Sequence, residues 1–404
     1  MNSRIKYTVV TTSTCIMLLL VIGTVLGRSA STDRPYPQLG VYTEVLHRIK
    51  SEYVEEPDMK SVTLGALNGL LESVDPFASY LNADQYKDYL KNKDAHKADI
   101  GLVLAKKFGF VGIVGVTPGS PAAKAGLSTN DMLETINGVA TRDMPLAYAS
   151  LLLEGDAGST VELTVVRVRR PEPQKIKLTR ADIVYPPVTG KMIPDEIGYI
   201  QPSTLAPGKV KEVAAMVDSL QKQGAHKLIL DLRNCAVGTP QDGIALANLF
   251  LAKGEIAYLQ GQKVPRQDFE ADASKDITKL PLVVITNRGT ADGAEIAAAA
   301  LLDDKRAELV GERTYGDASL RRAITMDDGG AIILSIAKYY SPSGKAIQDV
   351  GVTPQTVMSE PETQVELDEN GEPLPENPEQ PEHKQPEDPL LKKAIEIASG
   401  LKTA

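Results

Sequence analysis

Three carboxylates and one arginine lie in the sequence where a catalytic or binding site could form. Asp292 and Glu295 follow an apolar, β-branched run that ends at Thr286, and Asp317 and Arg321 come later in the chain. A strand that stops at a tight turn where a helix begins presents a side chain beside free backbone N–H groups, as α/β enzymes present a nucleophile. A carboxylate there can be a nucleophile in glycosyl or phosphoryl transfer, whereas peptide acyl transfer to it would give a labile anhydride.

The same residues fit a structural role. Asp292 and Glu295 have the spacing of a capping box, in which each side chain accepts a hydrogen bond from the backbone N–H of the other. Such a cap is worth roughly 1 kcal/mol. We therefore interpret Asp292 chiefly as the cap of the helix that the Ala-rich run 296–302 predicts.

The elements around these residues indicate an α/β core. Residues 282–286 and 227–234 are apolar runs typical of buried parallel strands. Residues 210–223 have the 3.6-residue periodicity of an amphipathic helix, which ends at Gly224. Helical periodicity also runs through 36–93, where the Asp-Pro segment 75–81 interrupts it.

Composition narrows the classes of partner and cofactor. The 404 residues carry a net charge of −9, which argues against a nucleic-acid partner. The two cysteines lie far apart and the four histidines are scattered, so the sequence predicts no disulfide, no metal site and no cofactor.

The N-terminus predicts export. Residues 7–26 are apolar over a length that spans a membrane, and Arg4 and Lys6 precede them. We expect 1–30 to be an uncleaved signal anchor, with a cleaved signal peptide as the alternative. The expected location is the inner (cytoplasmic) membrane with a single N-terminal span, and the bulk of the chain in the periplasm or outside the cell.

Several ordered motifs carry a resemblance to a known family. They are Asp75–Leu81, Gly119–Leu127 followed by Ile136–Gly138, Ile197–Ile200, Leu228–Asn234, Gly289–Ala291 with Glu295, Pro342–Gln348 and Gly351–Pro354. Together they resemble the carboxyl-terminal processing (tail-specific) serine peptidase family. The resemblance implies an α/β multi-domain fold with an N-terminal helical segment, a PDZ domain (β with two helices) and a ClpP/crotonase-like peptidase core.

The resemblance also implies that the catalytic dyad is lost. Where the family has its nucleophilic Ser and its general-base Lys, this sequence has Asp292 and Asp317, and Arg321 replaces the family's Gln. The oxyanion-hole region corresponds to Val237, Gly238 and Gly293. Val237 stands where the family has the first of two glycines, and a β-branched residue fits poorly where φ is positive.

Two hypotheses follow for the altered site. In the first, Asp292, Asp317 and Arg321 form an ion-pair cluster in the space of the lost dyad, because two carboxylates there repel unless a cation joins them. In the second, a hydroxyl from Thr290 or Ser319, with Lys305 or Lys345, forms a displaced working site. We expect these two hydroxyls to bond within their own turn and loop instead.

The PDZ resemblance predicts peptide binding. Such a domain adds a C-terminal peptide as a strand, and backbone amides capture the terminal carboxylate. The corresponding residues are Gly101, Leu102, Val103 and Leu104, with Val103 where the family usually has a second glycine. A purely structural PDZ domain is the alternative.

The predicted organisation has six parts. They are a signal anchor or signal peptide at 1–30, a helical region at 31–98, a PDZ domain at 99–180, a peptidase core at 181–358, an acidic Pro-rich linker at 359–388 and a helix at 389–404. The expected function is an exported peptidase homologue that binds protein C-termini or unfolded segments without cutting them, and the alternative is an active endopeptidase with a displaced nucleophile. Possible partners include an active peptidase relative and a second copy, docked through the terminal helices.

Overall fold

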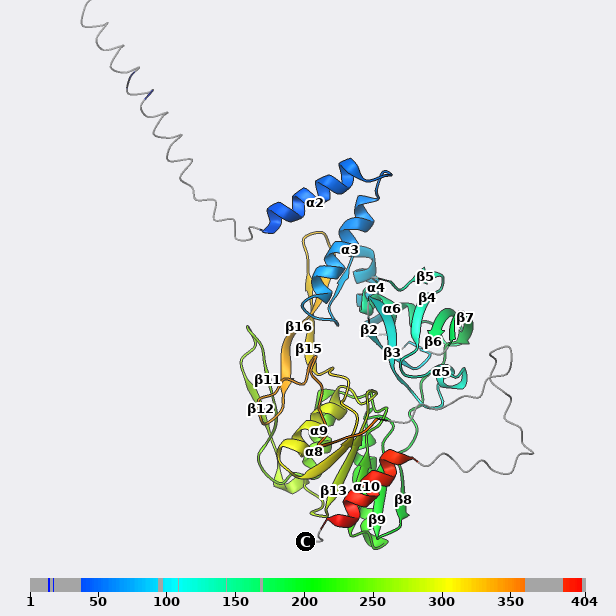
Figure 1. Cartoon of the computed structure of the whole chain (residues 1–404), viewed down its shortest axis with the longest axis vertical. Coiled ribbons are helices and arrows are strands. Elements are labelled where there is room, and N and C mark those ends of the chain that lie inside the picture. The colour runs from blue at the N-terminus through cyan, green and yellow to red at the C-terminus, as the bar shows by residue number, and fades with distance from the viewer. Residues whose placement is uncertain are drawn as a thin grey trace, which may run out of the picture. The chain divides into compact units, whose positions relative to one another are not determined.

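The computed structural model describes residues 14, 17, 38–93, 97–107, 109–142, 144–167, 170–359 and 388–401 (Figure 1). The chain divides into two compact units, Met1–Leu64 and Gly65–Ala404. The predicted membrane span and most of the acidic linker lie outside the described residues. Within the described ranges, no helix is long and apolar enough to cross a bilayer.

The first unit contains α2 (Gln38–Glu52) and the start of α3 (Met59–Glu72). Several apolar side chains of α2 are exposed, among them Leu39, Val41 and Val45. The second unit begins within α3 and continues through β1 (Ser79–Leu81) and α4 (Ala83–Lys93). The predicted helical region is therefore interrupted by a short strand, which helical periodicity alone did not indicate.

A six-stranded antiparallel sheet with two helices follows, as expected of a PDZ domain. Its strands pair in the order β2-β3-β4-β6-β7, and β5 pairs with β4. The bounds are β2 (Leu102–Lys107), β3 (Phe110–Val116), α5 (Pro121–Lys124), β4 (Met132–Ile136), β5 (Val139–Ala140), α6 (Leu146–Leu153), β6 (Thr160–Arg167) and β7 (Arg170–Thr179). The predicted hairpin turn is present, with φ of 51° at Asn137 and 76° at Gly138.

The core contains a mostly parallel six-stranded sheet in the order β17-β14-β13-β10-β9-β8, whose edge strand β8 is antiparallel to β9. Its elements are β8 (Thr189–Ile193), β9 (Ile197–Gln201), α7 (Lys209–Lys222), β10 (Lys227–Asp231), α8 (Pro240–Asn248), β13 (Leu282–Thr286), α9 (Gly293–Asp303), β14 (Ala307–Gly311) and β17 (Thr356–Val357). Two strand–helix–strand units contribute to this sheet: β9-α7-β10 and β13-α9-β14. A helix that connects two neighbouring strands returns the chain to the same end of the sheet, so the two strands of each unit pair in parallel.

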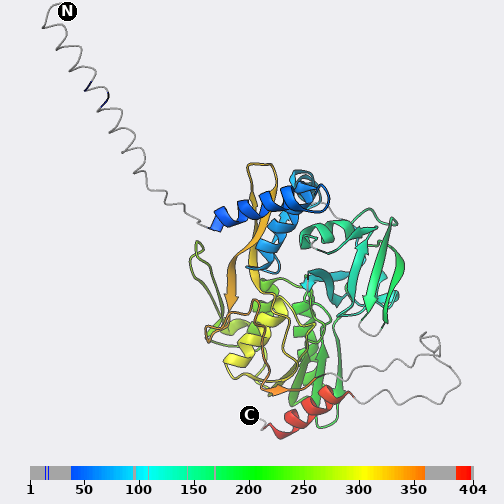
Figure 2. The same ribbon diagram turned by 45° about the horizontal axis from the view of Figure 1, so that its top comes forward.

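Alternating side chains of this sheet face two different layers. Leu228, Leu230 and Val284 pack with α7, α8 and α9, whereas Ile229 and Val283 pack with the C-terminal helix α10 (Pro389–Gly400). The helix α10 lies against the face of the sheet opposite α8 and α9 (Figure 1 and Figure 2). The predicted docking of this helix on another subunit is therefore corrected, because its apolar face is buried on the chain's own sheet.

A second sheet lies beside the first, in the order β1-β16-β11-β12, with β15 also paired to β16. Its remaining elements are β11 (Glu255–Gln260), β12 (Gln267–Glu270), the 3-10 turn η1 (Ala273–Lys275), β15 (Ser319–Thr325) and β16 (Ala331–Tyr340). Asp75 fixes the entry to β1, since its carboxylate accepts the N–H groups of Phe77 and Ser335, each at 3.0 Å. The segment before the PDZ domain is thus built into the core.

Candidate functional site

The turn that carries Asp292 has a backbone conformation that few side chains adopt. Asp292 has φ 51° and ψ −122°. The next residue, Gly293, has no room for a Cβ atom, which would lie 2.3 Å from the carbonyl oxygen of Thr239 at the start of α8. The close approach of α8 and α9 thus imposes a sharp turn, and such local strain is typical of positions that present a nucleophile.

Thr290 supports this turn. Its hydroxyl donates to the Leu232 carbonyl at 2.9 Å and accepts the Asn287 N–H at 3.1 Å. The Asn287 amide oxygen in turn accepts the N–H groups of Asn234 and Gly289. The prediction that the Thr290 hydroxyl bonds within its turn holds for the contact with Asn287 but not for the contact with Leu232, which ties the turn to the end of β10. The Thr290 side chain is fully buried.

The other candidates for a displaced site are also placed elsewhere. Ser319 is the first residue of β15 rather than part of a loop, and its hydroxyl lies 2.9 Å from that of Ser335 on the paired strand β16. The prediction that it bonds within its loop is therefore wrong, because strand pairing brings a partner from β16. Lys305 and Lys345 are exposed.

Glu295 joins the two loops of the site. Its carboxylate is completely buried and accepts the N–H groups of Asp292 at 3.1 Å, Gly316 at 2.6 Å and Asp317 at 2.7 Å, together with the Thr314 hydroxyl. Burial raises the pKa of Glu295 to about 8, against the four donors, which favour its charged form. Sequence reasoning identified this residue as part of a cap, but not as the link between positions 292 and 317.

Asp317 and Arg321 form the predicted ion pair. The Arg321 guanidinium bonds the Asp317 carboxylate, and both side chains are partly buried. The guanidinium carbon also lies 4.3 Å from the centre of the Phe77 ring, a favourable cation–π distance. Phe77 in turn contacts Tyr315 edge to face, with ring centres 6.0 Å apart. Phe77 and Tyr315 were not singled out by sequence, because their proximity depends on β1 joining the core.

Asp292 is the electrostatically strained member of the cluster. Burial raises its pKa well above the ordinary value, the Asp317 carboxylate adds to the rise, and Arg321 opposes it. Burial likewise raises the pKa of Asp317, and Arg321 again acts in the opposite direction. The three residues of the hypothesis therefore lie within reach of one another's charge, with the direct ion pair joining Asp317 and Arg321.

The capping prediction is correct for one of its two halves. Asp292 and Glu295 have the arrangement of a capping box, and the Asp292 N–H donates to Glu295. The Asp292 side chain itself forms no capping hydrogen bond. The reason lies in its backbone, since an N-cap residue ordinarily has an extended conformation and Asp292 has a positive φ.

The expected strain at Val237 is not found. Val237 and Gly238 are absent from the positive-φ residues of the described chain, whereas Asn234, three residues earlier, has φ 57°. The carbonyl of Val237 accepts the Leu205 N–H at 2.6 Å. A β-branched residue is tolerated here because the left-handed turn falls on Asn234, a residue type that adopts it readily.

The predicted peptide-binding strand is the edge strand of its sheet. Strand β2, which holds Leu102, Val103 and Leu104, is the outermost strand of its sheet. Gly101 has φ 84°, and a Cβ atom there would lie 2.3 Å from the Cβ of Ser120. This edge can accept an added strand.

Asp99 engages backbone donors at the start of the carboxylate loop of the PDZ domain. The Asp99 carboxylate accepts the N–H of Ile100 at 2.5 Å and interacts with the N–H of Gly101. Partial burial raises the pKa of Asp99, and these two N–H groups oppose the rise. A ligand carboxylate at this loop would therefore share the N–H of Gly101 with Asp99.

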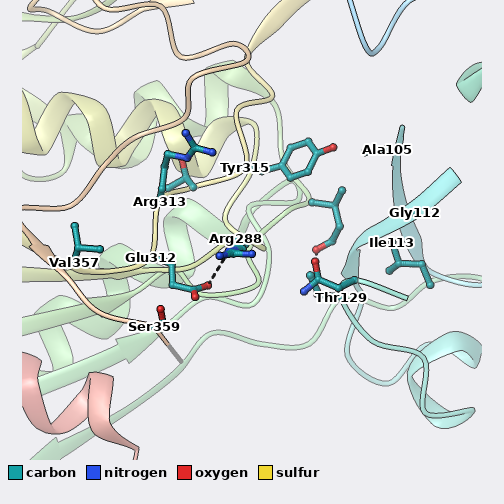
Figure 3. A pocket seen from close by; sticks show the side chains of 13 residues that line it. Ala105, Gly112, Ile113, Thr129, Arg288, Glu312, Arg313, Tyr315, Val357 and Ser359 are labelled. Atoms are coloured by element: carbon teal, nitrogen blue, oxygen red, sulfur yellow. Dashed lines mark hydrogen bonds and ion pairs between the residues drawn. The ribbon is translucent and has the colours of Figure 1, made fainter. Parts of the chain in front are cut away.

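One cavity, of about 550 Å³, lies between PDZ strands and the core loops (Figure 3). On the core side, the Arg288 side chain pairs with Glu312 at 3.7 Å, and Arg313 and Tyr315 lie beside them. On the PDZ side it is lined by residues that include Ile113. Because Arg288 precedes the turn of Asp292 and Tyr315 precedes Asp317, this cavity adjoins the loops of the altered site.

Comparison with known sequences decides the family. Residues 196–358 match the family described as Peptidase family S41, and residues 112–167 match the PDZ domain. The carboxy-terminal-processing protease of Bartonella bacilliformis is 31% identical over 347 residues, which cover 83% of this chain and 79% of the relative. The chain belongs to peptidase family S41.

Two further comparisons support the assignment. Carboxy-terminal processing protease CtpA of Bacillus subtilis is 32% identical over 362 residues, covering 88% of this chain and 76% of the relative. The solved photosystem II D1 C-terminal processing protease aligns with a TM-score of 0.64 and 26% identity, over 80% of this chain and 93% of that one. This S41 chain thus has the expected α/β multi-domain fold and is homologous to serine-type processing proteases with a PDZ domain.

Proposed function

We propose that this S41 homologue binds protein C-termini or unfolded segments and does not cut them. The observation that carries the proposal is the ion pair of Asp317 and Arg321, which occupies the position where the family resemblance places a general-base lysine. A serine-type reaction needs a hydroxyl activated by a base, and this site presents Asp292 instead. The PDZ domain and its edge strand β2 support binding.

The location and partners are part of the same proposal. The apolar segment at 7–26 with its basic flank supports a single N-terminal span, and hence a periplasmic or extracellular site of action. An active peptidase relative is a possible partner, since a binding protein of the same family recognises similar substrates. The exposed apolar side chains of α2 support a homodimer through the N-terminal helix.

The alternative, an active endopeptidase with a displaced nucleophile, has less support. Thr290 is fully buried and engaged by the turn, and Ser319 is bonded across the hairpin to Ser335. In the part of the chain that the structure describes, neither hydroxyl forms a hydrogen bond with a lysine.

Degradation of an unfolded protein tests the proposal. The full chain, purified in mild detergent, is incubated with casein beside an Asp292→Ala variant and beside wild type with a serine-protease inhibitor. We expect intact casein in all samples after prolonged incubation, while a pull-down with casein shows binding.

Cleavage of casein would contradict the proposal, and the variant and the inhibitor show which group is responsible. Cleavage that Asp292→Ala abolishes would make the carboxylate catalytic. Cleavage that persists in the variant but stops with the inhibitor would establish a displaced serine or threonine nucleophile.

A further inference from the structure

A second cavity, of about 570 Å³, lies in the second unit of the chain. Helix α6 of the PDZ domain, helix α4 and the hairpin of β15 and β16 contribute its walls. It shares no lining residue with the cavity of Figure 3. Pockets for small molecules have volumes of about 300–1,000 Å³. The cavity is therefore large enough to enclose a small organic molecule.

One face of α6 forms a wall of this cavity. The lining residues from this helix and its C-terminal end are Leu146, Ala147, Ser150, Leu151 and Glu154. Residues three and four apart in a helix share a face, so Ser150 and Glu154 are neighbours there. Glu154 is also the C-terminal capping residue of α6. The negative end of the helix dipole thus adds to the negative charge of this wall.

The charge on Glu154 is not compensated by an ion pair. The two cations that line the cavity are already paired, Arg321 with Asp317 and Lys97 with Asp156 at 3.3 Å. Among the described residues, the half-buried Glu154 carboxylate forms neither a hydrogen bond nor an ion pair. A carboxylate that has lost part of its water shell without gaining a partner is stabilised by a cation that enters the cavity.

The surroundings of Glu154 strengthen this preference. Burial raises the pKa of Glu154, the nearby Asp99 carboxylate adds to the rise, and Lys97 opposes it. The charged form of Glu154 is therefore less stable here than in water, and a cation beside it gains correspondingly more. Lys97 acts through its charge alone, and it competes with any cation that binds.

The other walls fit an ammonium group attached to an apolar group. An ammonium has three N–H donors. The cavity offers three kinds of acceptor for them: the Glu154 carboxylate, the Ser150 hydroxyl oxygen and the Asn92 amide oxygen. The Tyr89 ring and the Ile333 side chain also line it, and aromatic rings and aliphatic side chains accept the carbon part of such a molecule.

We propose that this cavity binds a small organic cation, a primary ammonium that carries one aromatic ring or a short aliphatic chain. The ammonium bonds the Glu154 carboxylate and the Ser150 hydroxyl, and the carbon group packs against Leu151 and Ile333. This site is separate from the peptide binding proposed above and does not depend on it.

Isothermal titration calorimetry with three matched probes tests the proposal on the full chain in mild detergent. The probes are 2-phenylethylamine, which is a cation at neutral pH, the neutral 2-phenylethanol and the anionic 3-phenylpropionate. Titrations into detergent alone are subtracted. We expect the amine to bind, the alcohol to bind about tenfold more weakly because it lacks the charge-assisted hydrogen bond, and the propionate to give no binding heat.

Two substitutions should move the affinity for the amine in opposite directions. Glu154→Gln should lower it about tenfold, to the affinity of the alcohol, and should leave the alcohol unchanged. Lys97→Gln should raise it severalfold, because a competing cation is removed. Glu162→Gln is the matched control, since it removes an exposed carboxylate of the same domain outside the cavity. It should leave every affinity unchanged.

A third substitution tests the cavity itself. Ser150→Phe places a ring inside the cavity and should abolish binding of the amine and the alcohol alike. Thermal unfolding of each variant is recorded beside wild type, so that loss of binding is read only from folded protein.

The remaining outcomes would overturn the inference. Equal affinity for the amine and the alcohol would refute recognition of a cation. Unchanged affinity for the amine in both Glu154→Gln and Ser150→Phe would place its site elsewhere, and absence of binding would refute the site.

A blocked tripeptide, acetyl-Gly-Lys-Gly-amide, distinguishes a free amine from a lysine side chain. We expect it to bind more weakly than 2-phenylethylamine. Tighter binding that Glu154→Gln abolishes would refute a small-molecule ligand. The casein pull-down tests the proposed function independently of all these results.

Discussion

At the scale of single residues, the site is dominated by buried carboxylates that are not fully compensated. Burial raises the pKa of Asp292, Glu295 and Asp317, and of these three only Asp317 forms an ion pair with Arg321 within the described residues. A carboxyl group whose pKa is raised on folding binds its proton more tightly in the folded chain than in the unfolded one. This group therefore favours the folded state at low pH, and that contribution is lost as the pH rises through the folded pKa.

We predict that the melting temperature falls as the pH rises from about 5 to about 9, because Glu295 titrates near 8 in the folded chain. Glu295→Gln should flatten this slope, since it removes the titrating group. Glu308→Gln is the control, an exposed carboxylate on β14. Calorimetry at several pH values measures the effect, and a slope in Glu295→Gln equal to that of wild type would contradict it.

At the scale of elements, α10 is secured to the core by its first residues. Asp388 caps the helix by accepting the Leu391 N–H at 3.0 Å and also bonds Arg233 at 2.7 Å. Arg233 in addition pairs with Asp231, which is fully buried at the end of β10. Arg233 immediately precedes Asn234. Its ion pair with Asp388 therefore connects α10 to the loop that leads to Val237 and Gly238.

We predict that Asp388→Ala lowers the free energy of unfolding by about 1–2 kcal/mol, because it removes a helix cap and a half-buried ion pair. The matched control is Glu396→Ala on the same helix, whose carboxylate is 70% exposed and pairs with Lys393. That variant should change stability by less than about 0.5 kcal/mol. Urea unfolding compares the two, and equal effects would show that the Arg233 connection contributes nothing.

At the scale of the whole molecule, the elements that hold positions 292 and 317 form one connected scaffold, whatever side chains stand at these positions. The turn of Asp292 comes from β13 and α9, the loop of Asp317 precedes β15, and Glu295 holds the two together. The small side chains of Ala236 and Ala291 pack with Phe77 in one hydrophobic cluster beside these loops. On the function proposed above, peptidase chemistry would therefore require changes in both loops but no new backbone.

We predict that the triple variant Asp292→Ser, Asp317→Lys, Arg321→Gln cleaves casein slowly and is blocked by a serine-protease inhibitor, since it supplies the nucleophile and base that the resemblance indicates. The same triple with Asp292→Ala should be inactive, as should Asp292→Ser alone. A folded triple variant without cleavage would instead place the missing component in residues 235–238.

Much of this protein was determined by local sequence alone. The strand–turn–helix at Asp292, the Asn137-Gly138 hairpin and the ordered motifs of the family depend on interactions between neighbouring residues, which is why they could be predicted. The ion pair of Asp317 and Arg321 does not belong here, because Arg321 lies in strand β15 and residues four apart in an extended strand are not neighbours by spacing alone. The family followed from the same motifs.

Only the tertiary structure decided how distant segments complete the site. The link from Glu295 to Gly316 and Asp317 and the contact of the Phe77 ring with Arg321 each depend on atomic positions that spacing does not encode. The positive φ at Asn234 rather than Val237 was decided by packing around the turn. The apolar face of α10 is likewise buried against a sheet whose strands lie far from it in sequence. The pattern of apolar residues therefore predicted the helix but not the surface on which it packs.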